Sequence, residues 1–300
     1  MEEKNKDNIF DSNPNYAVKT VVEEIADAEE MSNFAFMIEK LFAAIFKKAK
    51  VSKKDQEDVF GKLKDEITGR PFKVAIIGQS GVGKSSTLNA VFGLTLPVSD
   101  IKEGTTDIIE KIFPMRDGFN LSIYDMPGLL QSRKRDKVYE EMYREILPQC
   151  DVIVYVIKAN TRNIGDDCKI LKEVVLPICN ANSIKDNLII AVNKVDIIGE
   201  SINPDDPDLQ WDEFENRPTE KLWECIKKKR CDIFEKLISE GLVLLEEFEG
   251  SKTTFTPEQV VFYSANYEYN LGEFLKAITR AGKRGWIWTT TIGLDKFLSK

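Results

Sequence analysis

The glycine-rich run GQSGVGKSS at 78–86 constrains the fold of this chain more than any other segment. It fits the pattern G-x-x-x-x-G-K-[ST], and it stands between the apolar run KVAII and a segment in which apolar residues recur at helical spacing. Glycines here allow a tight loop whose backbone N–H groups converge on an anion, and the N-terminus of the following helix adds partial positive charge. We therefore expect a strand, a phosphate-binding loop and a helix, in that order.

Each residue of this loop has an expected role toward a phosphate chain. Lys84 would bridge the β- and γ-phosphates, and Ser85 would ligate Mg²⁺. Backbone and side-chain donors would surround the phosphates at the remaining positions, which are Gly78, Gln79, Ser80, Gly81, Val82, Gly83 and Ser86. The alternative is a glycine-rich turn between a strand and a helix that binds nothing.

A second motif, DMPG at 125–128, follows the apolar run NLSIY. In open α/β sheets ligands bind outside the carboxyl ends of the strands, so Asp125 would lie beside the phosphate loop. We expect Asp125 to hold Mg²⁺ through a water and the backbone N–H of Gly128 to sense the γ-phosphate. Taken alone, Asp-x-Pro-Gly is also good turn chemistry.

A third motif, NKVD, follows the run LIIAV and suggests recognition of a base. The carboxylate of Asp196 can accept hydrogen bonds from guanine N1–H and N2–H₂, a pair of donors that adenine does not offer. The stem of Lys194 can lie against the ring, and Asn193 can tie this segment to the phosphate loop. By itself NKVD is also compatible with a polar turn after a strand.

A fourth motif, YSAN at 263–266, follows the run QVVF. Here the backbone N–H of Ala265 can donate to guanine O6, while Ser264 shapes the turn. The motifs therefore share one context, because each follows a predicted strand.

From Phe72 onward, short β-rich runs alternate with helical patterns, which indicates an α/β fold. The runs VAIIG, VIVYVI and LIIAV are apolar throughout, as strands buried on both faces are. A short link containing Asp117 and Gly118 predicts a hairpin. We expect a mostly parallel six-stranded sheet with one antiparallel edge strand and helices on both faces. The predicted domains are an N-terminal helical extension at 1–70, with Ser52 capping one helix, an α/β domain at 71–282 with an insertion at about 197–257, and an apolar tail at 283–300.

Composition excludes several classes of chemistry. The chain has no histidine, which removes imidazole bases and histidine-containing zinc sites. Its net charge of −8 argues against broad nucleic-acid binding, so no DNA partner is expected. The five cysteines form no C-x-x-C pair and favour reduced thiols, and no signal peptide or membrane-length run is visible. A cytoplasmic protein is the expectation.

Together these motifs resemble those of the P-loop GTPases and, within them, the Era-like branch of the translation-factor-type GTPases. The resemblance covers about residues 72–282 and rests on GQSGVGKS, GTT at 104–106, DMPG, NKVD and SA, in the family's order. It implies a GTP-binding domain at 71–282, GTP and GDP with Mg²⁺ as ligands, slow hydrolysis of GTP to GDP, and action as a switch. Thr106 matches the threonine that coordinates Mg²⁺ and contacts the γ-phosphate, and Lys84, Thr106 and Gly128 are the expected catalytic set.

Three departures from the family pattern limit this resemblance. Leu129 stands directly after D-x-x-G, where Ras-like members have a catalytic Gln, so water would be positioned otherwise. Gly81 stands where some Era-like relatives have an Asn that binds an activating K⁺. Only a short tail follows Ala281, which is too little for the RNA-binding domain of Era. The sequence therefore disfavours contact with RNA or a membrane, although it leaves both open.

The segment between NKVD and YSAN is longer than a minimal domain of this kind needs. It holds an acidic loop, ESINPDDPDLQWDEFENRP, and then a helical stretch near Thr219–Phe248. Trp211 and Phe214 in the loop could anchor a partner or pin the loop to the body. An alternative function is a GTP-dependent assembly scaffold, resembling septins or immunity-type GTPases, with a homodimer formed through the switch face.

Overall fold

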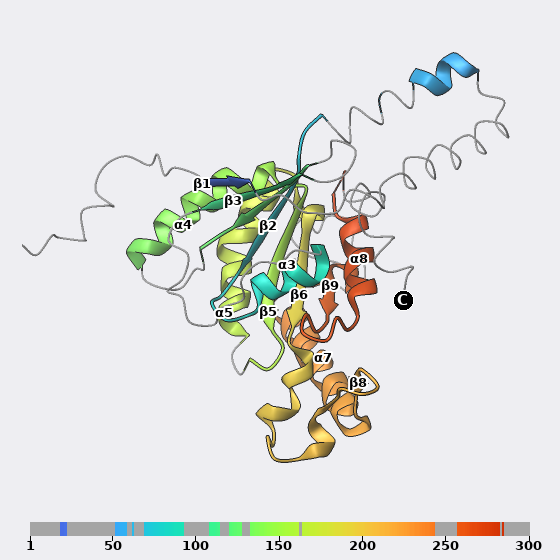
Figure 1. The fold of residues 1–300 in the computed structure, drawn as a ribbon. Coiled ribbons are helices and arrows are strands. Elements are labelled where there is room, and N and C mark those ends of the chain that lie inside the picture. Colours follow the sequence, from blue (N-terminus) through green and yellow to red (C-terminus); the bar gives the residue numbers. More distant parts are fainter. Residues whose placement is uncertain are drawn as a thin grey trace, which may run out of the picture.

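The computed structural model describes residues 19–22, 52–58, 62, 69–92, 108–114, 120–127, 133–161, 164–243, 257–282 and 284. Figure 1 shows a central sheet with helices on both faces and a lobe below it, at the end where β6 finishes. This arrangement is the α/β fold that the alternation of strands and helices predicts.

The sheet has the strand order β1-β3-β4-β2-β5-β6-β9. Its strands are β1 (Lys19–Val22), β2 (Phe72–Gly78), β3 (Ile109–Pro114), β4 (Asn120–Asp125), β5 (Val152–Lys158), β6 (Leu188–Asn193) and β9 (Val260–Phe262). Strands β4, β2, β5, β6 and β9 pair in parallel, whereas β3 pairs with β4 in antiparallel register. The predicted mostly parallel arrangement of six strands, with one of them antiparallel, is therefore confirmed.

A seventh strand, β1, was not predicted and lies within the segment expected to be helical. It pairs in parallel with β3, so β3 is not the edge strand of the sheet. The sequence KTVV explains the difference, because three of its four residues, Thr20, Val21 and Val22, are β-branched and favour an extended backbone. So short a strand offers little periodicity against the helical pattern around it.

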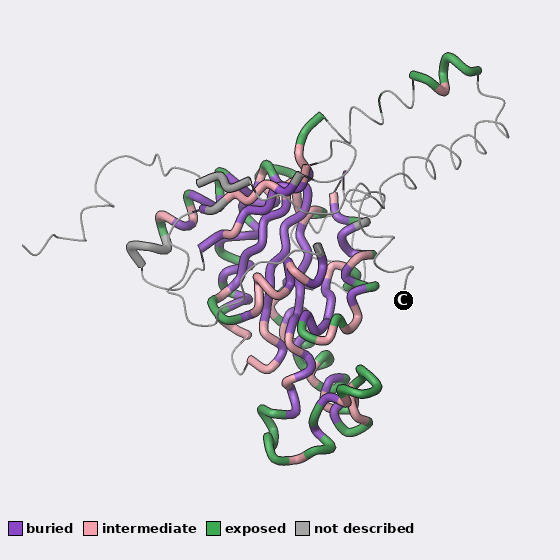
Figure 2. Tube along the Cα trace, in the orientation of Figure 1, coloured by how far each residue is buried: buried purple, intermediate pink, exposed green. Residues whose placement is uncertain are grey.

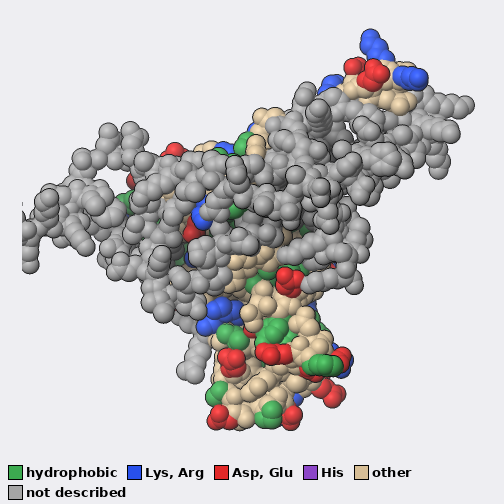
Figure 3. Space-filling view, in the orientation of Figure 1, with side chains coloured by type: hydrophobic (Ala, Val, Ile, Leu, Met, Phe, Trp, Pro, Cys, Tyr) green, Lys and Arg blue, Asp and Glu red, His purple; other side chains and the backbone are tan. Residues whose placement is uncertain are grey.

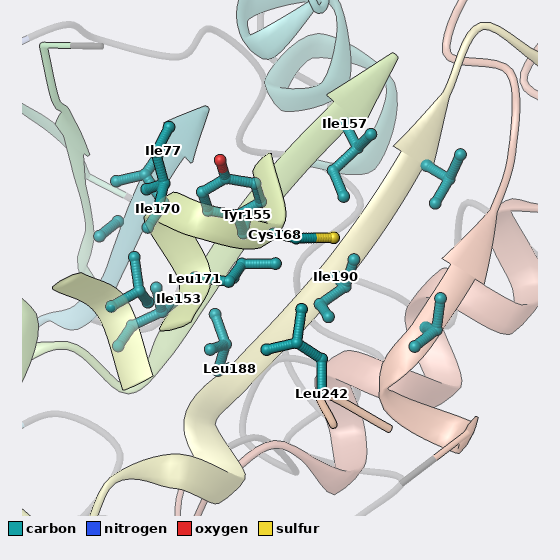
Figure 4. Close-up of a cluster of buried hydrophobic side chains, with 14 of the residues drawn as sticks. Ile77, Ile153, Tyr155, Ile157, Cys168, Ile170, Leu171, Leu188, Ile190 and Leu242 are labelled. Carbon is teal, nitrogen blue, oxygen red and sulfur yellow. The ribbon is translucent and has the colours of Figure 1, made fainter. Parts of the chain in front are cut away.

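Two layers of helices bury the two faces of the sheet. Helices α3 (Lys84–Phe92) and α8 (Leu271–Arg280) cover one face, where the core includes Val74, Val154 and Phe274. The other face is covered by α4 (Arg133–Ile146), by the continuous stretch α5 (Gly165–Ile170), η5 (Leu171–Val175) and α6 (Leu176–Ala181), and by α7 (Glu220–Ser239). Figure 2 shows the buried strands between these layers, and Figure 4 shows Ile153, Tyr155 and Leu171 packed within the second one.

The helical stretch over 165–181 contains a π-helical turn, η5, between two α-helical segments. The sequence predicts one helix near Asp167–Cys179, and this is confirmed apart from the π turn. Pro177 lies just after it and has no backbone N–H to donate, which accounts for an irregular ladder at this point. The turn begins four residues after Asp167, whose side chain is part of the site described below.

The lobe is formed by the insertion after β6. Besides α7 it contains the short helices η7 (Val195–Ile197), η8 (Gly199–Ser201) and η9 (Pro207–Leu209) and the two-stranded hairpin β7 (Trp211–Asp212) and β8 (Arg217–Pro218). The other short helices of the chain are η4 (Leu147–Gln149), η6 (Lys185–Asn187) and η10 (Pro257–Gln259). In Figure 3 the lobe presents acidic side chains in red among apolar ones in green.

Helix α7 begins where the sequence predicts and ends earlier than expected. Its N-cap is Thr219, whose hydroxyl accepts from the amide of Leu222, 3.3 Å away. Gly241, at φ 69°, stops the helix through bonds from Gly241 N to Ile238 O and from Leu242 N to Leu237 O, which is a Schellman motif. Residues 244–256, which complete the predicted insertion, lie outside the described residues.

Outside the sheet and lobe, the predicted helix start at Ser52 is confirmed: its hydroxyl accepts from the amide of Asp55 at 3.2 Å. The remainder of the extension at 1–70, and the tail at 283–300 apart from Arg284, lie outside the described residues. Within the described part of the chain, no helix combines the length and apolar character that crossing a membrane requires.

Candidate functional site

The predicted phosphate loop links β2 to α3, and three of its glycines hold a backbone that other residues rarely adopt. Gly78, Gly81 and Gly83 have φ values of 140°, 74° and 92°. A Cβ on Gly78 would also collide with the carbonyl of Val156 on the neighbouring strand. The loop therefore depends on glycine for both its turn and its close packing on β5.

Lys84 folds back onto this loop. Its ammonium donates to the carbonyls of Gly78 and Gln79, each at 3.2 Å. Burial lowers the pKa of Lys84, and the nearby Asp125 carboxylate partly offsets this effect. The ammonium is therefore held at the centre of the loop. Ser85 and Ser86 follow in the first turn of α3, and both are half-buried.

The residues expected to hold Mg²⁺ have suitable chemistry. Asp125 ends β4 and pairs with Ile76 of β2, two residues before the phosphate loop begins at Gly78. Its carboxylate and the hydroxyl of Ser85 are hard oxygen donors, which Mg²⁺ prefers. The described part of the site therefore fits the ion. Two other predicted residues, Thr106 and Gly128, lie outside the described residues, and so does Leu129.

Asn193 joins the phosphate loop to both base-reading motifs. Its side-chain amide donates to the carbonyl of Val82 at 3.1 Å, and its Oδ1 accepts from the amides of Lys194 at 2.7 Å and Ala265 at 3.0 Å. Asn193 is only 1% exposed, so these bonds are shielded from water. The predicted tie between NKVD and the phosphate loop is present in the structure.

The same contact qualifies the expected role of Ala265. Its amide N–H, expected to face guanine O6, donates to Asn193 Oδ1 in this structure. Donation to a guanine would require this amide to share its hydrogen or turn away from Asn193. Ser264 shapes the turn as expected, because its hydroxyl accepts from the amide of Tyr267 at 3.2 Å.

Asp196 has a buried oxygen that lacks a protein partner. The residue is 7% exposed, and its Oδ1 finds no hydrogen-bond partner among the described residues. An orphaned buried acceptor costs free energy, about 1–3 kcal/mol for a neutral group and more for a charged one. A buried carboxylate oxygen of this kind is available to accept a hydrogen bond from a ligand.

The structure adds contacts to the phosphate loop that the motifs do not reveal. Gln79 hydrogen-bonds to Asp167 on α5, and Asp167 also accepts from the hydroxyl of Tyr155 at 2.9 Å. On the other face, Thr87 of α3 shares a hydrogen bond with the hydroxyl of Tyr263. These partners are distant in sequence and match no pattern, so only the fold brings them to the loop.

Together, the loop, the acid at the end of β4 and the Asn193 bridge define a P-loop nucleotide-binding site at the carboxyl ends of the parallel strands. Comparison with known proteins agrees. Residues 73–194 match the model of the 50S ribosome-binding GTPase family.

Three relatives illustrate the similarity. YfjP of Escherichia coli K12 is 38% identical over 103 residues, covering 34% of this chain and 36% of YfjP. The tRNA modification GTPase MnmE of Desulforamulus reducens is 34% identical over 44% of this chain and 27% of its own length. GTPase Era of Carboxydothermus hydrogenoformans is 30% identical over 42% of this chain and 40% of its own length.

The matched region therefore spans less than half of each of these relatives. A structure of Era from Aquifex aeolicus bound to GDP and AlF4⁻ aligns over 71% of this chain and 57% of that one, with a TM-score of 0.44 and 20% identity. In its motifs and in the family match, residues 73–194 of this chain are similar to the P-loop GTPase domain of Era and its relatives.

Proposed function

We propose that this protein binds GTP and GDP with Mg²⁺, hydrolyses GTP slowly to GDP and phosphate, and acts as a molecular switch. The buried, unpartnered Oδ1 of Asp196 carries the proposal, because it supplies an acceptor where guanine would place N1–H and N2–H₂. The Asn193 bridge fixes this acceptor relative to the phosphate loop.

In this proposal most of the chemistry is positioning and electrostatic stabilisation. Lys84 would release its two loop carbonyls to bridge the β- and γ-phosphates, and Ser85, Asp125 and Thr106 would hold Mg²⁺. When bound, Mg²⁺ neutralises charge that develops on the phosphate oxygens. The backbone N–H of Gly128 would sense the γ-phosphate. Leu129 cannot orient a water by hydrogen bonding, so turnover is slow.

The first test is calorimetry of nucleotide-free protein with GTP, GDP and ATP, each with Mg²⁺. Tight binding of both guanine nucleotides with no heat from ATP is the expected result. Phosphate release from GTP then measures turnover. Folded protein that binds no guanine nucleotide would overturn the proposal and reduce the motifs to inherited features of the fold.

Assembly is the alternative output. A GTP-loaded homodimer through the switch face would make association, rather than turnover, the signal. Multi-angle light scattering with a non-hydrolysable GTP analogue and with GDP separates the two, since only the assembly function predicts a mass that depends on the nucleotide.

The proposed setting is the cytoplasm, with guanine nucleotide as the ligand and no DNA partner. The five cysteines are all free, which suits a reducing compartment. Burial raises the pKa of Cys168 to about 11 and that of Cys179 to about 12, so these two thiols are poorly reactive at neutral pH. The net charge of −8 disfavours non-specific binding to DNA or RNA.

A further inference from the structure

Residues 207–211 of the lobe make two separate contacts near the proposed base site, one with the turn after YSAN and one, within the lobe, with the segment that follows NKVD. The first is Trp211, at the start of β7, which is 9% exposed. Its ring stacks on Tyr267, with centroids 4.9 Å apart and planes at 18°, and meets Tyr269 edge-on at 5.2 Å and 75°. Both tyrosines belong to the turn that follows the YSAN motif.

Both tyrosines are hydrogen-bonded to Ser264, the residue next to Ala265. Ser264 and Tyr269 form a bridge, with Ser264 N to Tyr269 O at 3.2 Å and Tyr269 N to Ser264 O at 3.0 Å. The amide of Tyr267 donates to the hydroxyl of Ser264. A ring that holds Tyr267 and Tyr269 therefore also fixes the backbone at Ala265.

Asn216 locks Trp211 against this turn. Its Oδ1 accepts from the indole N–H of Trp211 at 3.2 Å, and its Nδ2 donates to the carbonyl of Tyr267 at 3.2 Å. Glu213, from the same hairpin, accepts from the hydroxyl of Tyr267 at 3.0 Å. The hairpin thus contacts Tyr267 at its ring, its hydroxyl and its backbone carbonyl.

The second place is on the NKVD side. Gly199 follows Asp196 by three residues, and a Cβ on Gly199 would overlap the carbonyl group of Leu209. Leu209 is 3% exposed and ends η9, two residues before Trp211. One short stretch of the lobe, 207–211, therefore packs against both halves of the base-reading site.

We propose that this stretch is a brace for the guanine-binding loops and that Trp211 is a positioning residue for guanine recognition, acting through Tyr267 and Tyr269. The inference rests on the proposed function, since it concerns the same base site. Without the brace, the loops that carry Asp196 and Ala265 lose their fixed separation. Guanine then dissociates faster and is distinguished less well from adenine.

The test compares Trp211→Ala with Trp223→Ala in the full chain. Trp223 lies on α7 in the same lobe, half-buried against the core, and none of its described ring contacts is with the YSAN turn. We expect Trp211→Ala to raise the dissociation rate of fluorescent GDP at least tenfold and to lower the GDP-to-ADP affinity ratio in competition. Trp223→Ala should leave both within twofold. General destabilisation would weaken GDP and ADP alike and leave the ratio unchanged.

Two further variants keep the proposal testable if Trp211→Ala does not fold. Asn216→Gly removes both locking bonds and tolerates the φ of 47° at this position. Gly199→Ala pushes Leu209 away from the NKVD side. Each should accelerate GDP release several-fold, and release within twofold of wild type in both would overturn the proposal.

Amide hydrogen exchange separates failure of the brace from failure of the proposed function. In nucleotide-free protein, exchange over 263–270 should accelerate in Trp211→Ala and stay unchanged in Trp223→Ala. Unchanged exchange in both variants would overturn the brace whatever nucleotide binds. If exchange accelerates in Trp211→Ala but the wild-type protein binds no guanine nucleotide, then Trp211 does hold these loops in place. In that case both the guanine site and the role of Trp211 in recognising guanine would be wrong.

Discussion

At the residue scale, the proposed recognition of guanine depends most on the carboxylate of Asp196. Asp196→Asn replaces an acceptor by an amide that presents N–H groups, so two charge-assisted hydrogen bonds to guanine are lost. We expect GDP affinity to fall about 100-fold or more. Xanthosine diphosphate, whose C2 carbonyl can accept from the new amide, should bind better than it does to wild type.

Calorimetry with both nucleotides measures this change. Asp205→Asn is a matched control, because Asp205 is an exposed residue of the lobe. The guanine assignment would be wrong if Asp196→Asn bound GDP as tightly as the control does.

The buried carboxyl of Asp167 should make the stability of the protein depend on pH. Burial raises its pKa from 3.8 to about 6, and Asp166 adds to this, although hydrogen bonds from Tyr155 and Gln79 lower it. The folded state then holds the proton more tightly than the unfolded chain, so the free energy of unfolding falls as pH rises from about 4 to about 6 and levels off above. The contribution is at most about 3 kcal/mol.

Urea unfolding across this pH range, for wild type and Asp167→Asn, isolates the effect. The difference between the two proteins should shift steadily with pH and become constant above about pH 6. Two curves that remain parallel from pH 4 upward would assign the pH dependence to other groups.

The sequence predicts site residues only where chemistry and chain spacing coincide. Asn193 and Asp196 follow a strand in a short motif, so their roles can be proposed without a structure. Tyr155 and Trp211 act through rings and hydroxyls that meet partners far along the chain, and no spacing rule indicates such contacts. For Trp211 the sequence left two roles open, and the structure shows that it pins the loop to the body.

The same distinction holds for whole elements. The sequence predicts β5 and β6 because their runs are apolar throughout. Strands that are buried on both faces, as these two are, require such runs. The strands β1, β7 and β8 are too short for periodicity to identify, and they form because a partner edge or a turn is present. Helix α7 ends at Ser239, because the left-handed backbone of Gly241 stops it before the predicted Phe248.

At the scale of elements, replacing a glycine in the loop between β2 and α3 should weaken nucleotide binding, whereas the same change in α8 should not. Gly83→Ala places a Cβ on the amide of Asn193 at a φ of 92°, so it strains the loop and breaks the link between the phosphate and base sites. We expect GDP affinity to fall at least tenfold, measured by calorimetry.

Gly272→Ala makes the same chemical change in the first turn of α8, where a Cβ meets nothing within 4 Å. It should leave GDP affinity unchanged and raise stability by about 0.5–1 kcal/mol, because alanine is a better helix former. Equal GDP affinity in the two variants would contradict the role given to the loop backbone.

At the scale of the whole molecule, a buried cluster joins the two ends of the described α/β domain. Asp151, just before β5, accepts from the guanidinium of Arg70 at 2.7 and 3.2 Å, from the amide of Lys73 at 2.9 Å and from Arg284 at 2.9 Å. Arg284 also donates to the carbonyls of Arg70 and Pro71. One carboxylate therefore holds together the segment just before β2 and the segment just after α8, at the side of the sheet opposite the nucleotide site.

Removing Asp151 and removing Arg284 should lower the free energy of unfolding by different amounts. Asp151 and Arg284 are 5% and 4% exposed, so Asp151→Ala leaves a buried guanidinium without its carboxylate and should lower the free energy of unfolding by about 3–5 kcal/mol. Arg284→Ala should cost less, about 1–3 kcal/mol, because Asp151 keeps Arg70 and the Lys73 amide. The double variant should lower the free energy of unfolding by less than the sum of the two single changes, since the two residues share one interaction.

Urea unfolding measures all three variants, with Glu273→Ala as the control because its pair with Lys276 is exposed. If Asp151→Ala were no more destabilising than this control, the cluster would not hold the two ends of the domain together.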